Sequence, residues 1–285
     1  MHLIPSFTLE GFNIGPIYVY TWGLTAAIGV LTAIFLALRK TNNLQVAVGN
    51  SQKKISEEQF WTLSIVLTLS IFIGARILYI FETWNYYAAD PVRTIQIWQG
   101  GFSLFGGALV GIVAVYYWSR RNKINFWMLG WIFTPAWLFG LFFGRLGCFL
   151  IHDHLGKPTS LPWGVWVQGA YRHEPAMYEA IWILLIGTGL YFLDKRYPSA
   201  LADSGTSPSK GEDKSGEVYL RNILFPLSLM LYSVGRFFID FFRVGDDHFY
   251  NLTLAQWFCV AVVVLVGKYV IRSSFRFRRG WRAFS

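Results

Sequence analysis

The stretch Phe60–Phe81, FWTLSIVLTLSIFIGARILYIF, contains a single charged residue, Arg76. A helix needs about 20 mostly apolar residues to cross the hydrocarbon core of a bilayer. The same pattern recurs along the chain, and it predicts seven spans: Tyr18–Leu38, Phe60–Phe81, Phe102–Trp118, Phe126–Ile151, Met177–Leu193, Ile223–Phe242 and Leu252–Ile271. The sequence therefore predicts an all-α, polytopic integral membrane protein with about seven transmembrane helices.

The amino-acid composition excludes an ordinary soluble domain. Hydrophobic residues make up 54% of the chain and charged residues only 14%, whereas a soluble domain carries about a quarter charged residues. The net charge of +9 raises the possibility of nucleic-acid binding. However, the basic residues occur in short clusters between apolar stretches, which is typical of membrane proteins. We therefore expect membrane lipid, and no nucleic acid, among the partners.

The distribution of Lys and Arg between the spans predicts the topology. Alternate loops and the C-terminal tail carry eighteen basic residues, and the other loops carry only Arg93, Lys157 and Arg172. Loops rich in Lys and Arg stay in the cytoplasm. We therefore expect the N-terminus outside and the C-terminus in the cytoplasm of a bacterial cell, with the chain in the inner membrane.

We expect one transmembrane domain over residues 1–285, acting as a monomer. Residues 198–216 are rich in Ser, Gly, Asp and Lys, and this composition predicts a flexible cytoplasmic loop. Residues 272–285 mix Arg with Phe and Trp. This mixture predicts a basic cytoplasmic tail that lies on the anionic inner leaflet.

Four arginines lie within or at the ends of the predicted spans: Arg76, Arg145, Arg236 and Arg243. An arginine at the bilayer centre costs roughly 2.5–3.5 kcal/mol on insertion scales. Any one of them could be an anchor that reaches the interface, or half of a structural ion pair. Because four occur together with acids and histidines, the sequence favours a polar cavity within the membrane.

The sixth predicted span shows how such a cavity is lined. Arg236, Asp240 and Arg243 are spaced i, i+4 and i+7, so they share one helix face. Asp240 can pair with either arginine and leave the other available. Because arginine forks match phosphate oxygens, this positive face predicts a site for the phosphate of a lipid.

The fourth span ends in GRLGCFLIHDHLG, residues 144–156. Arg145 lies one to two turns before His152, Asp153 and His154, which the topology places at the outer interface. Histidine can accept a proton near neutral pH, and a neighbouring carboxylate can orient its ring. An interfacial polar loop remains an alternative, and the ligand set is only weak evidence for a metal site.

Two further residues in this region have structural interpretations. Cys148 lies within the apolar stretch, where the thiolate is disfavoured, so we interpret it as a core residue. Glu179 lies near a helix N-terminus, beside Arg172 and His173. An acid at a helix start suits a cap or an ion pair, so this role is favoured over catalysis.

Taken together, these segments resemble the prolipoprotein diacylglyceryl transferase family along nearly the whole chain. Single blocks are weak signals, but their order is specific. The blocks are Gly74-Ala75-Arg76, Ile97–Ser103 with Gly106-Gly107, Gly144–Gly156, Leu161–Gly164, Arg172-His173 with Tyr178-Glu179, Gly235-Arg236-Phe237, Phe241–Arg243 and Gln256.

The resemblance implies a reaction and a set of site residues. Phosphatidylglycerol would donate its diacylglyceryl group to the lipobox cysteine in the signal peptide of a prolipoprotein, forming a thioether and releasing glycerol phosphate. No metal and no soluble cofactor is implied. Arg145 and Arg236 would hold the phosphate, and His152 or His154 would take the thiol proton, with Asp153 orienting the ring. Further substrate-binding residues would be Arg243, Arg76, Gly156, Asp240, Glu179 and Ser103.

One departure from the family pattern bears on the mechanism. Many members have His or Tyr just before Gly106-Gly107, where this chain has Phe105, whose side chain cannot accept a proton. We hypothesise that the triplet His152-Asp153-His154 takes over this role. A transporter or flippase for an anionic lipid or small anion, using the same arginines, remains the alternative function. A non-catalytic seven-helix scaffold is a third possibility, but it would not need four intramembrane arginines.

Overall fold

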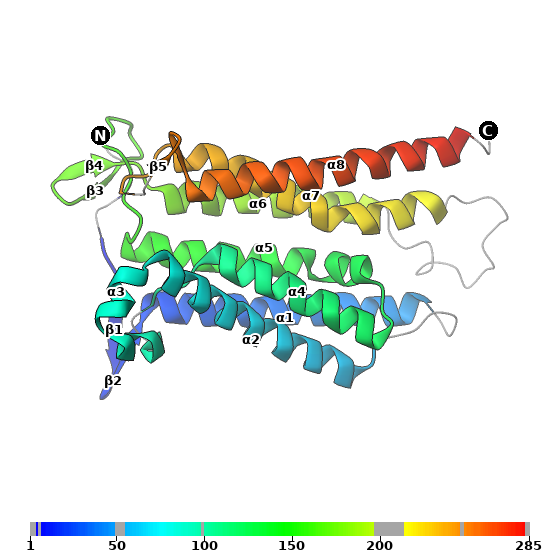
Figure 1. Ribbon diagram of the computed structural model, residues 1–285, viewed down its shortest axis with the longest axis horizontal. Coiled ribbons are helices and arrows are strands. Elements are labelled where there is room, and N and C mark those ends of the chain that lie inside the picture. The colour runs from blue at the N-terminus through cyan, green and yellow to red at the C-terminus, as the bar shows by residue number, and fades with distance from the viewer. Residues whose placement is uncertain are drawn as a thin grey trace. The chain divides into compact units, whose positions relative to one another are not determined.

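The computed structural model describes residues 4, 7–48, 55–97, 100–196, 214–245 and 248–282. Within them the chain is mainly helical (Figure 1). The long helices are α1 (Thr21–Val48), α2 (Glu57–Glu82), α4 (Leu104–Asn122), α5 (Phe126–Ile151), α6 (Pro175–Arg196), α7 (Lys214–Asp240) and α8 (Leu254–Arg282). The shorter elements are α3 (Trp84–Ala89), the 3-10 helix η2 (Pro91–Ile95) and the antiparallel hairpins β1 (Gly11–Ile14)–β2 (Ile17–Tyr20), β3 (Val165–Val167)–β4 (Ala170–Arg172) and β5 (His248–Phe249)–β6 (Leu252–Thr253).

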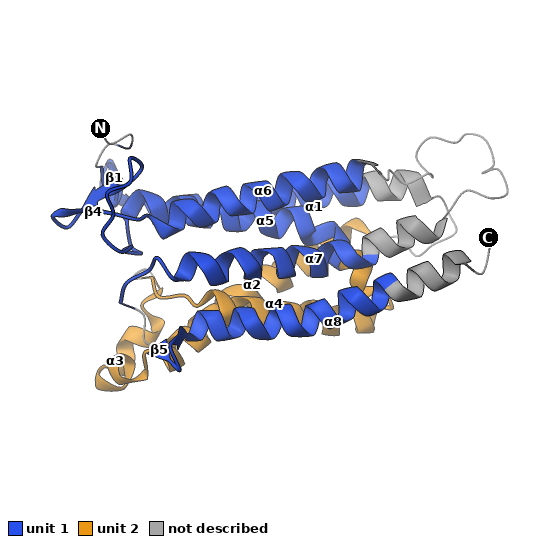
Figure 2. Cartoon of the chain, turned by 90° about the horizontal axis from the view of Figure 1, so that it is seen from above, with its two compact units in different colours: residues 1–47, 130–285 blue, residues 48–129 orange. Residues whose placement is uncertain are grey.

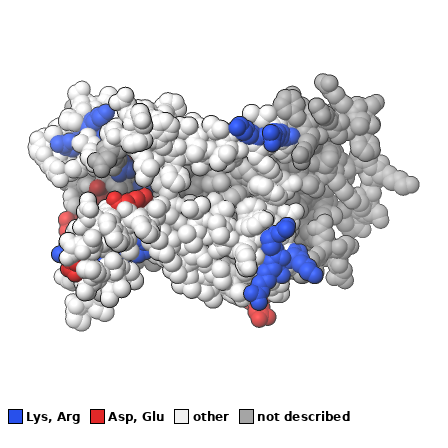
Figure 3. Space-filling view, viewed as in Figure 1, with Lys and Arg blue, Asp and Glu red and all other residues white. Residues whose placement is uncertain are grey.

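Six helices in the described part of the chain are long and apolar enough to cross a membrane: α1, α2, α5, α6, α7 and α8. On the face shown in Figure 3, charged side chains of the described residues lie toward the ends of the helices, and the surface between them is uncharged. The prediction of an all-α polytopic membrane protein is therefore confirmed. The orientation of the termini stays a prediction.

The third predicted span, Phe102–Trp118, overlaps α4, which is not among these six helices. This helix has 19 residues, and its last turn contains Arg120 and Arg121. Each arginine is strongly unfavourable in the hydrocarbon core, so the apolar part of the helix is shorter than its full length. Within the described residues, length and composition therefore support six spans, whereas the sequence predicted about seven.

The chain divides into two compact units, coloured separately in Figure 2. Unit 1 contains residues 1–47 and 130–285, and unit 2 contains residues 48–129. The predicted single domain over residues 1–285 stays a prediction. Of the predicted loop 198–216, residues 198–213 lie outside the described residues, and Lys214 begins α7. Of the predicted tail, residues 272–282 continue α8, and 283–285 lie outside the described part.

Unit 2 is built on close packing between α2 and α4. Helix α2 begins at a capping box, in which the Ser56 hydroxyl accepts from the backbone N–H of Gln59 and the Gln59 side chain accepts in return. Further along, Gly74 of α2 faces Gly106 of α4, and a Cβ at either position would overlap the carbonyl oxygen of the other. Small residues let membrane helices approach this closely.

Unit 1 holds the remaining long helices, joined by polar contacts at positions far apart in sequence. Lys40 of α1 and Trp131 of α5 both contact Asp194 of α6: Lys40 Nζ lies 2.8 Å from Oδ2, and Trp131 Nε1 donates to Oδ1 at 2.7 Å. Between α6 and α7, Trp182 Nε1 donates to the carbonyl oxygen of Leu231 at 3.0 Å. These contacts join α1, α5 and α7 to α6, and α5, α6 and α7 carry the polar side chains described next.

Candidate active site

A carboxylate in unit 1, that of Glu179 on α6, lies between two arginines from neighbouring helices. Its Oε2 lies 2.7 Å from Nε of Arg145 on α5, and its Oε1 is bound by Nη1 of Arg236 on α7. The Tyr232 hydroxyl donates to Oε2 at 3.2 Å. Glu179 is only 1% exposed, and Arg236 4%. Charges buried this deeply persist only when they are paired, so the three helices are held in register by this contact.

The ion pairs continue from Arg236 to the end of α7. Arg236 Nη2 lies 2.9 Å from Asp240 Oδ1, and Arg243 Nη1 lies 3.8 Å from the same oxygen. The sequence predicted that Asp240 pairs with either arginine and leaves the other available, whereas in the structure it contacts both. We call Arg145, Arg236, Arg243, Glu179 and Asp240 the arginine cluster. Its three cations against two carboxylates leave one formal positive charge in excess, which suits an anionic ligand.

The start of α8 fixes the other oxygen of Asp240. The Thr253 hydroxyl donates to Asp240 Oδ2. Thr253 is itself held by a reciprocal cap, because its N–H donates to Gln256 Oε1 at 2.9 Å and its hydroxyl accepts from the Gln256 N–H at 3.1 Å. Asp240 is therefore oriented from two helices.

His152 directly follows α5 and has a φ of 52°, in the left-handed region that commonly ends a helix. Its Nε2 lies 2.8 Å from the Phe7 carbonyl oxygen, and its Nδ1 lies 2.8 Å from Glu174 Oε2. The bond to Glu174 raises the pKa of His152, and burial raises the pKa of Glu174. Both ring nitrogens are therefore engaged. His152 thus joins residues before β1 to the start of α6.

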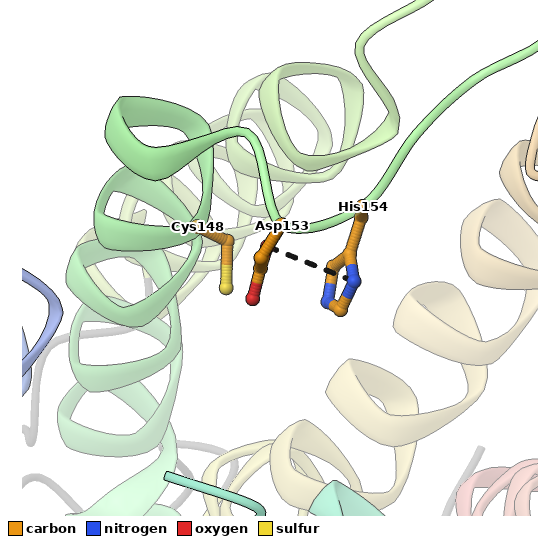
Figure 4. A group of neighbouring side chains, drawn as sticks. All are labelled: Cys148, Asp153 and His154. Atoms are coloured by element: carbon orange, nitrogen blue, oxygen red, sulfur yellow. Dashed lines mark ion pairs between the residues drawn. The ribbon is translucent and has the colours of Figure 1, made fainter. Parts of the chain in front are cut away.

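Asp153 and His154 extend from the end of α5 beside Cys148, as Figure 4 shows. Asp153 Oδ1 lies 3.6 Å from His154 Nδ1, and the ligand atoms of all three residues lie within 4.8 Å of one another. Burial together with the positive charges of Arg145 and Arg243 lowers the pKa of His154 to about 3. The ring is therefore neutral at pH 7 and has a free lone pair. Cys148 is 7% exposed, so its predicted burial is confirmed.

The segment after His154 pairs with the chain that follows α7. Gly156 forms a β-bridge with Arg243, and Lys157 N–H donates to the Phe242 carbonyl oxygen at 2.8 Å. A Cβ on Gly156 would overlap the His173 carbonyl oxygen. Glycine is therefore required for this close approach, which brings the predicted residues Gly156 and Arg243 side by side.

Two predicted site residues lie in unit 2, and both have other partners. The Arg76 side chain makes five hydrogen bonds to backbone carbonyls of residues 93–101, among them Arg93 at 2.7 Å and Gly101 at 3.0 Å. Its N–H groups are thus used to shape that loop, which argues against the predicted phosphate contact. The Ser103 hydroxyl donates to Glu82 Oε1 at 3.0 Å.

Some residues of the site were missed by sequence reasoning. Tyr232 precedes Arg236 by four residues, so the helical spacing that linked Arg236 to Asp240 could also have found it. Glu174 could not be assigned a partner from sequence. Glu179 was expected to pair near Arg172 and His173, but its partners are Arg145 and Arg236.

Comparison with known proteins identifies the family of this chain. The prolipoprotein diacylglyceryl transferase family matches residues 10–272. A protein of Nostoc sp. named phosphatidylglycerol–prolipoprotein diacylglyceryl transferase is 30% identical over 86% of this chain and 81% of its own length. Proteins of the same name from Bifidobacterium adolescentis and Bacillus cereus are 28% and 27% identical, each over 92% of this chain and over 77% and 90% of their own lengths, respectively. The chain therefore belongs to the prolipoprotein diacylglyceryl transferase family.

Proposed function

We propose that this protein transfers the diacylglyceryl group of phosphatidylglycerol to the lipobox cysteine of prolipoproteins. The products are a thioether-linked lipoprotein precursor and glycerol phosphate. The proposal extends to this chain the activity named for its relatives. We further propose that it acts as a monomer in the bacterial cytoplasmic membrane, where both substrates arrive in the plane of the bilayer.

The arginine cluster is the observation that carries this proposal. Arg145 and Arg236 are buried guanidiniums whose orientation is fixed by Glu179, and Arg243 adds a third cation beside Gly156. Fixed donors aimed at developing charge are the largest single contribution in many enzymes. We propose that Arg145 and Arg236 bind the lipid phosphate and stabilise the charge that develops when the glyceryl carbon–oxygen bond breaks.

Four further residues complete the proposed phosphate site. Arg243 contacts the phosphate or the head group from the end of α7, and Asp240 and Glu179 hold the guanidiniums in place. Gly156 allows the close approach to His173 and the bridge that positions Arg243. Arg76 and Ser103 are better explained as residues that shape the loop before α4, because their polar groups are bound within unit 2.

The thiol has to lose its proton before it attacks, because the thiolate is the nucleophile. We propose that Asp153 and His154 provide this activation, with His154 receiving the proton and Asp153 orienting the ring. This assignment is favoured over His152, whose two ring nitrogens already bind Glu174 and Phe7. The family pattern that this chain resembles has His or Tyr at Phe105, and we propose that a proton acceptor from the end of α5 takes over that role.

The test is an assay of the purified protein in detergent micelles with phosphatidylglycerol and a lipobox peptide. Mass spectrometry of the peptide should show a diacylglyceryl adduct, and Arg145→Ala and Arg236→Ala should abolish it. Glu10→Gln, an exposed acid before β1, is the matched control and should leave the adduct unchanged. A folded wild-type protein that forms no adduct but moves an anionic lipid between leaflets would overturn the transferase in favour of the transporter.

A further inference from the structure

The hairpin β5–β6, between α7 and α8, ends in two large aromatic side chains that the protein leaves uncovered. Phe249 is 68% exposed and Tyr250 is 80% exposed, more than any other large hydrophobic side chain in the described part of the chain. The hairpin lies at the end of unit 1 where α8 begins (Figure 1). We propose that it is an interfacial anchor, whose two rings insert among the lipids of the leaflet that supplies the donor lipid to the arginine cluster.

The backbone at the tip of this hairpin does not suit a tyrosine in water. Tyr250 and Asn251 are the two turn residues between the strands, and their φ angles are 51° and 64°. A two-residue turn with positive φ at both positions favours Asn and Gly. Asn251 fits this preference, whereas Tyr250 is strained there and packs little against the protein. A contact of its ring outside the protein explains why an aromatic residue suits this position.

Lipid is the partner that the neighbouring surface indicates. Helix α8 begins at Leu254, directly after β6, and it is one of the helices long and apolar enough to cross a membrane. Only 11% of its apolar stretch is buried, the lowest share among the six candidate spans. Leu254 and Trp257 are also exposed, so the apolar surface continues from the tip into the span. Trp and Tyr concentrate where such spans meet the head groups, because their rings are apolar and their polar atoms stay hydrated.

The hairpin is fixed to α8 but offers little to a peptide. Trp257 Nε1 donates to the carbonyl oxygen of Phe249 at 2.9 Å, which ties β5 to the first turn of the helix. The Phe249 and Tyr250 rings pack edge to face, with centroids 4.7 Å apart. Each strand has only two residues. A peptide that adds a strand needs a longer free edge, so lipid is favoured over the substrate peptide as the occupant.

The hairpin also reaches the proposed phosphate site. Thr253 of β6 lies three residues after Tyr250, and its hydroxyl donates to Asp240 Oδ2. Asp240 in turn contacts Arg236 at 2.9 Å and Arg243 at 3.8 Å. An anchored tip therefore holds β6, and β6 holds the carboxylate that orients two arginines. The lipid contact stands independently of the proposed function, whereas its effect on the rate of transfer rests on that function.

The depth of the tip in the bilayer is the first measurement. A nitroxide spin label on Tyr250→Cys is placed in the full-length protein in vesicles of phosphatidylcholine and phosphatidylglycerol. Cys148 and Cys259 are buried, and unsubstituted protein gives the background labelling. Leu265→Cys, exposed on α8, is the lipid reference, and Glu58→Cys, exposed at the start of α2, is the water reference. The Tyr250→Cys label should collide with oxygen more, and with a water-soluble nickel chelate less, than the Glu58→Cys label. Equal collision rates for these two labels would overturn the anchor.

The same label distinguishes lipid from peptide at the tip. A lipobox peptide added to the vesicles should leave the mobility and the oxygen collisions of the Tyr250→Cys label unchanged, because lipid already surrounds it. A label that is water-accessible without peptide and immobilised by it would show that the rings bind the substrate peptide, which would overturn the lipid anchor.

Replacing the ring tests its effect on transfer. Tyr250→Asn removes the ring and places a favoured residue at a positive φ, so the unfolding midpoint in micelles should be unchanged or higher. Adduct formation in vesicles, per folded molecule, should still be at least about threefold slower. Gln168, with a φ of 51°, has the same position in the turn of β3–β4. Gln168→Asn is therefore the matched control and should keep the wild-type rate. A wild-type rate in Tyr250→Asn would overturn the link between the tip and the site.

Variants of Thr253 test whether the tip acts through Asp240. Thr253→Ser keeps the hydroxyl and should keep the rate, whereas Thr253→Val should lower it. Combining Thr253→Val with Tyr250→Asn should slow transfer no further than Thr253→Val alone, because two changes on one path are not additive. Additive losses would overturn this path. Wild-type protein that forms no adduct in micelles or vesicles would overturn the proposed function instead, while the spin-label measurement would still decide the anchor.

Discussion

The carboxylate of Glu179 on α6 forms a buried ion pair with the guanidinium of Arg236 on α7. Because Glu179 also pairs with Arg145 on α5, a single acid holds two cations from different helices. The proposed phosphate therefore enters a site whose arginines are already held in place. The free energy needed to orient the two guanidiniums is spent during folding, so substrate binding does not have to supply it. Groups oriented in advance stabilise a transition state most effectively.

Removing the charge of Glu179 should destabilise the protein. In Glu179→Gln, Arg236 keeps its pair with Asp240, but Arg145 loses the carboxylate that it contacts, and an unpaired buried charge costs roughly 3–5 kcal/mol. We expect a lower midpoint of thermal unfolding in detergent micelles. Glu10→Gln, an exposed acid, is the control and should unfold like the wild type. Equal midpoints for the two variants would mean that the buried pair does not hold the helices together.

Replacing arginine by lysine should affect the two ends of the arginine cluster differently. Arg236 uses Nη1 for Glu179 and Nη2 for Asp240, and lysine cannot make both contacts with one planar group. We expect Arg236→Lys to lower the rate of adduct formation by roughly 10²–10³-fold. Arg243 has a longer contact, 3.8 Å, and Arg243→Lys should lower the rate less. Equal losses in the two variants would show that the fork geometry of Arg236 is not what matters.

The sequence predicted those contacts that depend on position along one helix. Arg236, Asp240 and Arg243 were placed together because helical periodicity puts them on one face, and the ion pairs confirm it. The same periodicity located the helices from their apolar stretches. The predicted third span is the exception, because α4 has only 19 residues, ends in Arg120 and Arg121, and is not among the six helices that are long and apolar enough to cross a membrane.

Contacts between helices could not be predicted, because they depend on packing that no local pattern encodes. Glu179 pairs with residues 34 and 57 positions away, on α5 and α7, rather than with its neighbours Arg172 and His173. In the same way, His152 looked like a base from its sequence neighbours. No local pattern places Phe7 and Glu174 on its two ring nitrogens, because both lie far from it in sequence.

His152 and His154 should therefore respond differently to alanine. His152→Ala leaves the buried Glu174 carboxyl without its partner and frees the Phe7 carbonyl, which should cost about 1–3 kcal/mol of stability. Adduct formation per folded molecule should change little. His154→Ala should lower the rate by roughly 10²-fold or more while the unfolding midpoint stays near the wild-type value. If His152→Ala is folded and inactive while His154→Ala is active, thiol activation belongs to His152.

The approach of two segments at Gly156 should be intolerant of a single added methyl group. In Gly156→Ala the new Cβ would overlap the His173 carbonyl oxygen, so the bridge to Arg243 has to separate. We expect slower adduct formation together with a lower unfolding midpoint, since both the backbone pairing and the position of Arg243 depend on this contact.

Gly187 on α6 provides the matched control, because nothing lies within 4 Å of a Cβ built there. Gly187→Ala should stabilise the helix by about 0.5–1 kcal/mol and leave the rate unchanged. A Gly156→Ala variant with wild-type rate and stability would show that the segment can shift without disturbing Arg243.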